Sequence, residues 1–214
     1  MANPMGRDFL KEFKTIEGIV SNKMPYLSTL NKDAFKTLIG CIISTRTKDE
    51  TTHEACRRLF SKYPTARSML KAPLKDIRAL IYPVGFYRTK AKYIKEASRD
   101  IVERFRGRIP SNKKELLKIK GVGSKCANLV LSEIFSRPEV CVDTHVHRIT
   151  NRLGWVNTKD VLSTEISLKK VFPSDILGRI NKNLVIFGKK ICRPLRPLCR
   201  ECALNKVCKF FRRR

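Results

Sequence analysis

The sequence predicts an all-α fold, and three observations support this prediction. Apolar residues recur every three or four positions along most of the chain, as they do on the buried face of an amphipathic helix. Hardly any segment alternates with period two, which a half-buried strand would require. Breaks that contain proline, such as Tyr63-Pro64, Tyr82-Pro83 and Phe172-Pro173, separate the apolar groups, and such breaks are typical of helix ends.

The expected helices follow the apolar groups in chain order. The first group has Phe9, Phe13, Ile16 and Val20, and the clearest group begins at Ile94. The groups occupy residues 9–20, 35–42, 55–60, 94–105, 130–134, 146–153 and 176–187. With the shorter segments between the proline breaks, we expect roughly ten or more helices joined by short connections.

The net charge is the most unusual property of the chain. Its 214 residues include 46 Lys and Arg against 19 Asp and Glu, which leaves a formal charge of +27. An excess of this size is costly in self-repulsion and indicates a polyanionic partner. Nucleic acid is the first candidate, because each neutralised phosphate releases counterions. An anionic membrane surface is the second candidate partner. The remaining alternative is a highly soluble protein from a salty or hot environment, although in such proteins the positively and the negatively charged residues usually both increase in number.

The N-terminal segment MANPMGRDFL has no long apolar run, so no signal peptide is expected. No segment approaches the ~18 apolar residues that span a membrane. We therefore expect a protein of the cytoplasm and nucleoid, or of the nucleus in a eukaryote, that is not secreted and has no membrane partner. In such a reducing compartment the eight cysteines should fill the core or hold a metal rather than form disulfides.

Four cysteines near the C-terminus share one short segment with the spacing Cys-x6-Cys-x2-Cys-x5-Cys, namely Cys192, Cys199, Cys202 and Cys208. Four-cysteine zinc sites usually have two separate Cys-x2-Cys pairs. A single pair with a longer arm on each side favours a cubic iron–sulfur cluster, which is larger than one ion and also takes four thiolates. Zinc and four unrelated reduced thiols are the alternatives.

The same segment is strongly basic. From Lys189 to the C-terminus there are ten Lys and Arg and one acid, Glu201. A cluster that held this loop rigid would present Arg193, Arg196 and their basic neighbours to phosphates. We therefore expect the cluster to support DNA binding.

The stretch SNKKELLKIKGVGSKCANLVLSEIF predicts a helix–hairpin–helix. Its first helix should run from Ser111, as N-cap, to about Lys118 with Leu116, Leu117 and Ile119 on its apolar side, and its second from Ser124 or Lys125 to about Phe135. Glycine permits left-handed backbone angles and a close approach of the backbone. The turn amides of Gly121, Val122 and Gly123, with Ser124 at the helix N-terminus, therefore form a candidate phosphate site. An ordinary tight turn is the alternative.

Lys125 stands in the first turn of the second helix. A cation there opposes the helix dipole, and the neighbouring basic residues also disfavour the charged ammonium. A neutral amine is a nucleophile, so Lys125 is a candidate catalytic residue. The alternative is a simple phosphate contact.

A candidate carboxylate follows in EVCVDTHVHRI. Asp143 precedes a helix that should begin near Thr144, where Asp is a good N-cap, and capping does not exclude catalysis. His145 and His147 are two positions apart and cannot share a helix face, so no metal pair is expected there. The remaining cysteines are expected to be small buried hydrophobic residues: Cys41, Cys56, Cys126 and Cys141.

Taken together, KGVGSK, VDTHVHRI and the cysteine spacing resemble endonuclease III, the iron–sulfur branch of the helix–hairpin–helix DNA glycosylases. The resemblance extends over residues 33–208. It implies a two-lobed all-α fold with one helical barrel lobe at 27–137, which carries the hairpin at about 112–135. The second lobe would join 1–26 to 138–214 and hold one [4Fe–4S] cluster in the loop 192–208.

The resemblance also implies the reaction. A monomer would bind double-stranded DNA that carries a damaged base or an abasic site, and would flip the damaged nucleotide out of the stack. The lysine at the position of Lys125 would attack C1′, expel the base and form a Schiff base, after which β-elimination cuts the strand 3′ to the lesion. Asp143 would stabilise positive charge on the sugar or handle protons. The expected enzyme is a bifunctional glycosylase and AP lyase for oxidised pyrimidines such as thymine glycol.

Two further stretches are similar to DNA-wedging elements of that family. In YPVGFYRTKAKYI, Phe86 with Val84 and Tyr87 would fill the space left by the flipped base, and core packing is the alternative for Phe86. In IISTRTKDE, Arg46 stands between two threonines where bacterial members usually have glutamine, which leaves the preference for the opposite base open.

Three alternative functions remain. A monofunctional glycosylase would remove thymine or uracil from mismatches with guanine, but such relatives usually lack the lysine. A non-catalytic DNA-binding protein would use the metal centre for structure alone. A redox sensor on DNA would need the cluster to change its oxidation state on binding.

Overall fold

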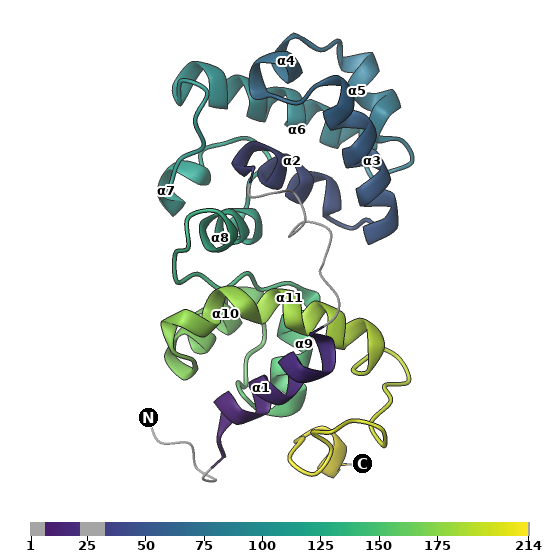
Figure 1. Cartoon of the computed structure of the whole chain (residues 1–214), viewed down its shortest axis with the longest axis vertical. Helices are drawn as coiled ribbons and strands as arrows, with labels where there is room; N and C mark the ends of the chain where they lie inside the picture. Colours follow the sequence, from purple (N-terminus) through teal and green to yellow (C-terminus); the bar gives the residue numbers. More distant parts are fainter. Residues whose placement is uncertain (1–6, 22–32, 214) are drawn as a thin grey trace. The chain divides into compact units, whose positions relative to one another are not determined.

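The computed structural model describes residues 7–21 and 33–213 (Figure 1). In this part of the chain there are eleven α-helices, one π-helical segment and one 3-10 turn, and no strand. The predicted all-α class is therefore confirmed. None of the helices in these ranges is long and apolar enough to cross a membrane.

The residues divide into two compact units. One unit joins α1 to the chain from Pro138 onward, and the other extends to Arg137. The boundary that we expect at residues 26 and 27 lies outside the described ranges. The unit that ends at Arg137 contains α2 (Ala34–Ser44), α3 (Asp49–Lys62), α4 (Ala66–Lys71), α5 (Leu74–Ile81), α6 (Tyr87–Arg99), a π-helical segment (Asp100–Arg104), α7 (Lys113–Leu116) and α8 (Ser124–Glu133).

In that unit, α6 is a shared packing partner of several helices. Helices α2, α4 and α5 all contact it. Its apolar face comes from Ala91, Ile94 and Ala97, which are fully buried and follow helical spacing. Helix α2 is buried along most of its length and also contacts α8. The positions of α2 and α8 therefore depend on a shared core.

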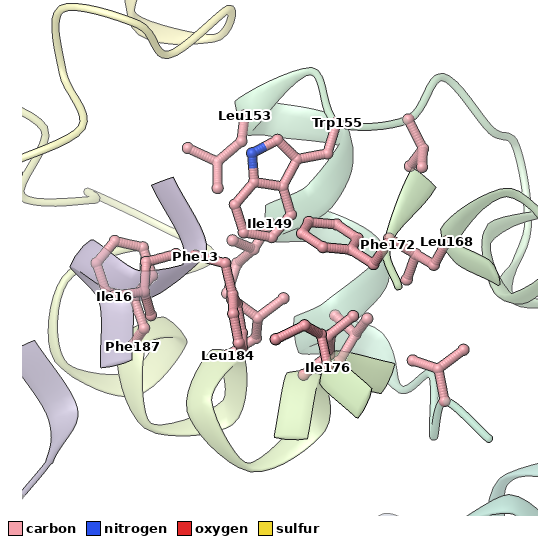
Figure 2. Close-up of a cluster of buried hydrophobic side chains, with 14 of the residues drawn as sticks. Phe13, Ile16, Ile149, Leu153, Trp155, Leu168, Phe172, Ile176, Leu184 and Phe187 are labelled. Atoms are coloured by element: carbon pink, nitrogen blue, oxygen red, sulfur yellow. The ribbon is translucent and has the colours of Figure 1, made fainter. Parts of the chain in front are cut away.

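The other unit contains α1 (Phe9–Val20), α9 (Thr144–Leu153), α10 (Val161–Val171), α11 (Ser174–Lys190) and the 3-10 turn Phe211–Arg213. Its core gathers around three aromatic rings, Phe13, Trp155 and Phe172, which pack edge to face (Figure 2). Their centroids are 5.1 to 6.4 Å apart. Such pairs add stability beyond the area that they bury.

A buried ion pair joins α1 to this core. Arg7 Nη2 donates to Glu12 Oε2 at 2.6 Å, and Trp155 Nε1 donates to the same oxygen at 2.7 Å. The Arg7 and Glu12 side chains are each only 9% exposed. Because a buried charge is costly without a partner, these three groups depend on one another.

We expect Glu12→Gln to lower the free energy of unfolding by about 3 kcal/mol, because it leaves the buried Arg7 charge uncompensated. Glu17→Gln on the same helix is the matched control. Glu17 pairs with Arg179 in a more exposed position, so its loss should cost less than about 1 kcal/mol. Urea unfolding followed by circular dichroism measures both, and equal losses would contradict the role given to Glu12.

Candidate functional site

The predicted hairpin is present, with a shorter first helix than expected. Helix α7 covers only Lys113–Leu116, and its N-cap is Asn112, whose side chain accepts from the Glu115 amide at 2.9 Å. The prediction of Ser111 as N-cap is therefore wrong. Asn112 is an equally good cap residue, and Leu116, the last residue of the helix, is buried.

The apolar side of the hairpin also differs in one residue. Leu116 and Ile119 are buried as expected, whereas Leu117 is exposed. The amide of Ile119 bonds to the carbonyl of Leu116, so a tight turn replaces the continuation of the helix to Lys118. Helix α8 ends at Glu133, two residues before the predicted end, which is the usual variation at a helix terminus.

The hairpin turn depends on Gly121. Its φ is +81°, and a Cβ at this position would lie 2.9 Å from Cβ of Tyr93 on α6. Both the backbone conformation and the close contact therefore require glycine. Gly123 differs, since its φ is −101° and a Cβ there would meet no atom within 4 Å.

The turn leaves backbone amides available beside α8. Among the described residues, the amides of Gly121, Gly123 and Ser124 have no acceptor, and Gly123, the N-cap of α8, provides no side-chain cap. The amide of Val122 donates to the carbonyl of Ile119, and its side chain is buried. Three amides at a helix N-terminus form a site that suits an anion.

Lys125 follows these amides in the first turn of α8, where it is half-buried. The next residues, Cys126 to Leu131, are all buried. Cys126 Sγ lies 2.6 Å from Cys41 Sγ of α2. The lysine therefore extends from a helix that is fixed to the core on its other side.

The four cysteines that we expect in the core, including Cys56 and Cys141, are all buried, which confirms that prediction.

Asp143 belongs to the other unit, and its predicted capping role is confirmed. Its Oδ1 accepts from the amides of His145 and Val146 at 2.9 and 3.0 Å. Within the described ranges, Oδ2 accepts no hydrogen bond. One oxygen thus satisfies the helix, while the second is available to another group.

Arg46 and Phe86 lie together on the surface of the unit that carries the hairpin. Phe86 is 64% exposed, so the alternative of core packing is wrong. The Arg46 guanidinium lies 5.8 Å from the centroid of the Phe86 ring. Both residues line a cavity of about 330 Å³ that Gly121 of the hairpin turn also lines. The full lining comprises Ile42, Thr45, Arg46, Phe86, Thr89, Lys90, Tyr93 and Gly121.

The neighbours of Phe86 differ from the prediction. Val84 is only 1% exposed and packs in the core, so it is not a surface wedge. Tyr87 is half-buried and packs edge-on against Tyr82, which is 60% exposed. The sequence reasoning missed Tyr82 because it treated Tyr82-Pro83 only as a break. The exposure of Tyr82 has no signal in the sequence, because an aromatic residue before a proline can equally be buried.

The four C-terminal cysteines, Cys192, Cys199, Cys202 and Cys208, line one small cavity. Burial raises the pKa of the Cys202 thiol, and charges on the other three thiols raise it further. In the described part of the chain, no three or more Cys, His, Asp or Glu side chains converge on a single-ion site. Four thiolates held this close together would need positive charge to offset their mutual repulsion.

Two arginines of α9 hold this loop, and the sequence reasoning missed both. Arg152 donates to the carbonyls of Arg193 and Pro194 at 2.7 and 2.9 Å. Arg148 donates to the carbonyl of Cys192 at 2.9 Å. Their spacing of four places both on one face of α9, and this spacing was the available signal. The helix capped by Asp143 is therefore tied to the cysteine loop.

Residues 39–174 match the family described as "HhH-GPD superfamily base excision DNA repair protein". The chain is 50% identical to endonuclease III of Thermotoga maritima over 182 residues, which cover 85% of each chain. It is 34% identical to endonuclease III of Bacillus subtilis over 84% of this chain and 83% of the relative. It is also 40% identical to endonuclease III homolog 1, chloroplastic, of Arabidopsis thaliana, but this alignment spans only 48% of the plant protein.

The fold is similar to three solved structures in particular. A non-covalent endonuclease III–DNA complex has a TM-score of 0.84 and 28% identity, and covers 96% of this chain and 95% of that one. A trapped covalent endonuclease III–DNA intermediate has a TM-score of 0.84 and 27% identity, over 98% and 99%. A thermostable thymine-DNA glycosylase has a TM-score of 0.85 and 25% identity, over 96% of both chains.

Two alanine variants of the hairpin distinguish stability from DNA contact. Gly121→Ala should lower the free energy of unfolding by about 2 kcal/mol, because the residue is left-handed and its Cβ meets Tyr93. Gly123→Ala should cost less than about 1 kcal/mol, yet weaken DNA affinity about tenfold if the backbone approaches a phosphate there. Urea unfolding and fluorescence anisotropy with a DNA duplex measure the two quantities. Unchanged affinity in Gly123→Ala would exclude close contact at this turn.

Proposed function

The chain belongs to the HhH-GPD superfamily of base excision DNA repair proteins and, within it, to the endonuclease III family, and from this premise we propose that Lys125 is its nucleophile. The protein is a DNA glycosylase and AP lyase that acts on DNA. Oxidised pyrimidines of the thymine glycol type are its proposed substrates. The single observation that carries the assignment is the half-buried lysine in the first turn of α8, directly after the hairpin amides.

The hairpin binds the DNA backbone in this proposal. The available amides of Gly121, Gly123 and Ser124 donate to a phosphate, while Val122 completes the turn. Such contacts position the strand without reading its sequence. The amides that bind the phosphate directly precede Lys125 in the chain. Binding of the phosphate at the N-terminus of α8 therefore orients the strand for attack by this lysine.

The lysine then performs two linked steps. Nζ of Lys125 forms a bond to C1′ as the bond from C1′ to the base breaks, and the base leaves with a proton. The sugar ring opens to an imine, loss of a proton from C2′ follows, and the 3′ phosphate departs. A covalent intermediate of this kind divides one difficult step into two easier ones. Asp143, through Oδ2, stabilises the positive charge that develops on the sugar or accepts a proton.

Arg46 and Phe86 are the proposed wedge, and Tyr87 follows Phe86 in the chain. Removing a base from the stack costs a few kcal/mol, and an exposed apolar ring partly offsets this cost. The exposure of Phe86 and its contact with Arg46 support this role. The two side chains would then enter the duplex together.

We further propose that Cys192, Cys199, Cys202 and Cys208 hold one [4Fe–4S] cluster. The cavity that all four side chains line supports this assignment. The bound cluster supplies positive charge and a rigid support. The chain then presents Arg193 and Arg196, both exposed, to phosphates of the DNA.

A nicking assay on a duplex with one thymine glycol tests the nucleophile. Lys125→Gln should lose strand cleavage almost completely and retain most binding, since the loss of one positive charge changes DNA affinity only several-fold. Lys120→Gln removes the same charge from an exposed position in the same hairpin, and should still cut. Normal nicking by Lys125→Gln would refute the assignment. Base release without nicking by the wild type would indicate a monofunctional glycosylase instead.

Asp143→Asn separates catalysis from capping. Asn caps helices as well as Asp does, so the free energy of unfolding should be unchanged, while base release slows about 100-fold or more. Asp160→Asn is the matched control, because Asp160 caps α10 in the same unit by accepting from the Ser163 amide at 2.8 Å. Single-turnover base release measures the effect. Equal rates in the two variants would leave Asp143 as a cap alone.

The iron and sulfide content of the purified protein tests the proposed cluster. Purified protein should be yellow-brown and contain about four iron and four sulfide per chain. Cys202→Ser should lose both, whereas Cys56→Ala, a change of a buried cysteine in the other unit, should retain them. Colourless protein with stoichiometric zinc would contradict the proposal. A folded iron-free protein that binds DNA normally would exclude the supporting role in DNA binding.

A further inference from the structure

Lys90 of α6 is a buried lysine whose amine holds the loop after α2. The residue is 5% exposed. Its Nζ donates to the carbonyls of Ile43 and Thr45 at 2.7 and 2.5 Å, and to Oγ1 of Thr47 at 2.9 Å. Burying an amine is costly unless its donors are satisfied. All three acceptors belong to the end of α2 and the loop that follows it, so Lys90 fastens this loop to α6.

The acceptors flank Arg46. Thr45 precedes it and Thr47 follows it, while Arg46 itself has a φ of +53°, which is an uncommon conformation for a residue with a side chain. From the other side, a Cβ at Gly85 would lie 2.9 Å from the carbonyl oxygen of Arg46. The backbone of Arg46 is therefore held between Lys90 and the Gly85 loop.

The charge of Lys90 suits this arrangement. Burial lowers the pKa of Lys90 to about 8, so that the amine remains cationic at neutral pH. An ammonium has three N–H donors, which match the three acceptors. Methionine has similar length and provides none of them.

We propose that Lys90 is a positioning residue that sets, through Arg46, the preference for the base opposite the lesion. This inference rests on the proposed function, in which Arg46 enters the duplex beside Phe86. A guanidinium carries only donors. On its major-groove edge guanine exposes two acceptors, O6 and N7, whereas adenine exposes a donor beside its acceptor. A correctly held Arg46 therefore favours guanine over adenine opposite the damaged base.

The test compares the cleavage of thymine glycol opposite guanine and opposite adenine. The wild type should favour guanine about tenfold in kcat/KM. Lys90→Met should bring this ratio to within about twofold of unity, chiefly through KM. Its cleavage of an abasic site in single-stranded DNA should equal that of the wild type, because no opposite base is present there.

Lys95→Met is the matched control. Lys95 is also on α6, and its amine donates to the carbonyls of Leu70 and Ala72 at the end of α4. This variant loses the same kind of interaction away from Arg46. It should be destabilised like Lys90→Met and keep the preference for guanine.

Two more variants keep the test decisive if Lys90→Met folds poorly. Thr47→Val removes one acceptor near the surface and should shift the ratio in the same direction by a smaller factor. Arg46→Ala should abolish the preference, and Lys90→Met should then have no further effect on the ratio.

An unchanged ratio in folded Lys90→Met and Thr47→Val, or a wild type without preference, would overturn the inference. A wild type that cleaves neither duplex would instead overturn the proposed function.

Discussion

The contact between the Gly121 backbone and Tyr93 is the constraint on which the hairpin-bearing unit depends. It fixes the hairpin turn to α6, and only a residue without Cβ can occupy that place. The same helix holds the loop of Arg46 through Lys90 and begins directly after Phe86. One helix thus sets the positions of three segments that are proposed to contact DNA, so a shift of α6 would move all three together.

The two groups proposed for the chemistry are each held by the first turn of a helix. Lys125 extends from α8, whose following residues are buried as far as Leu131. Asp143 caps α9, which is tied to the cysteine loop through Arg148 and Arg152. The amides at a helix N-terminus favour a carboxylate such as that of Asp143 and disfavour a charged ammonium such as that of Lys125. Rigid support on the other side of each helix limits the loss of orientation during reaction.

Much of this organisation could be predicted from local sequence signals. Helical spacing indicated the fold class, and the cap at Asp143 and the burial of Cys41 and Cys126 followed from residue type. The errors concern choices that tertiary contacts decide. Asn112 rather than Ser111 caps α7, in which Leu116 is buried, and Val84 is buried although Phe86, two residues later, is exposed. Lys90 was hidden among 46 basic residues, since its acceptors lie 43 to 47 positions earlier in the chain.

The central claim is that Lys125 bonds covalently to the DNA, and borohydride trapping tests it most directly. The protein would be mixed with a duplex that carries one thymine glycol, reduced with borohydride and digested, and the modified peptide located by mass spectrometry. The account predicts a stable protein–DNA complex with the sugar attached to Nζ of Lys125. Attachment to another amine, such as that of Lys120, or base release without any covalent complex, would contradict it.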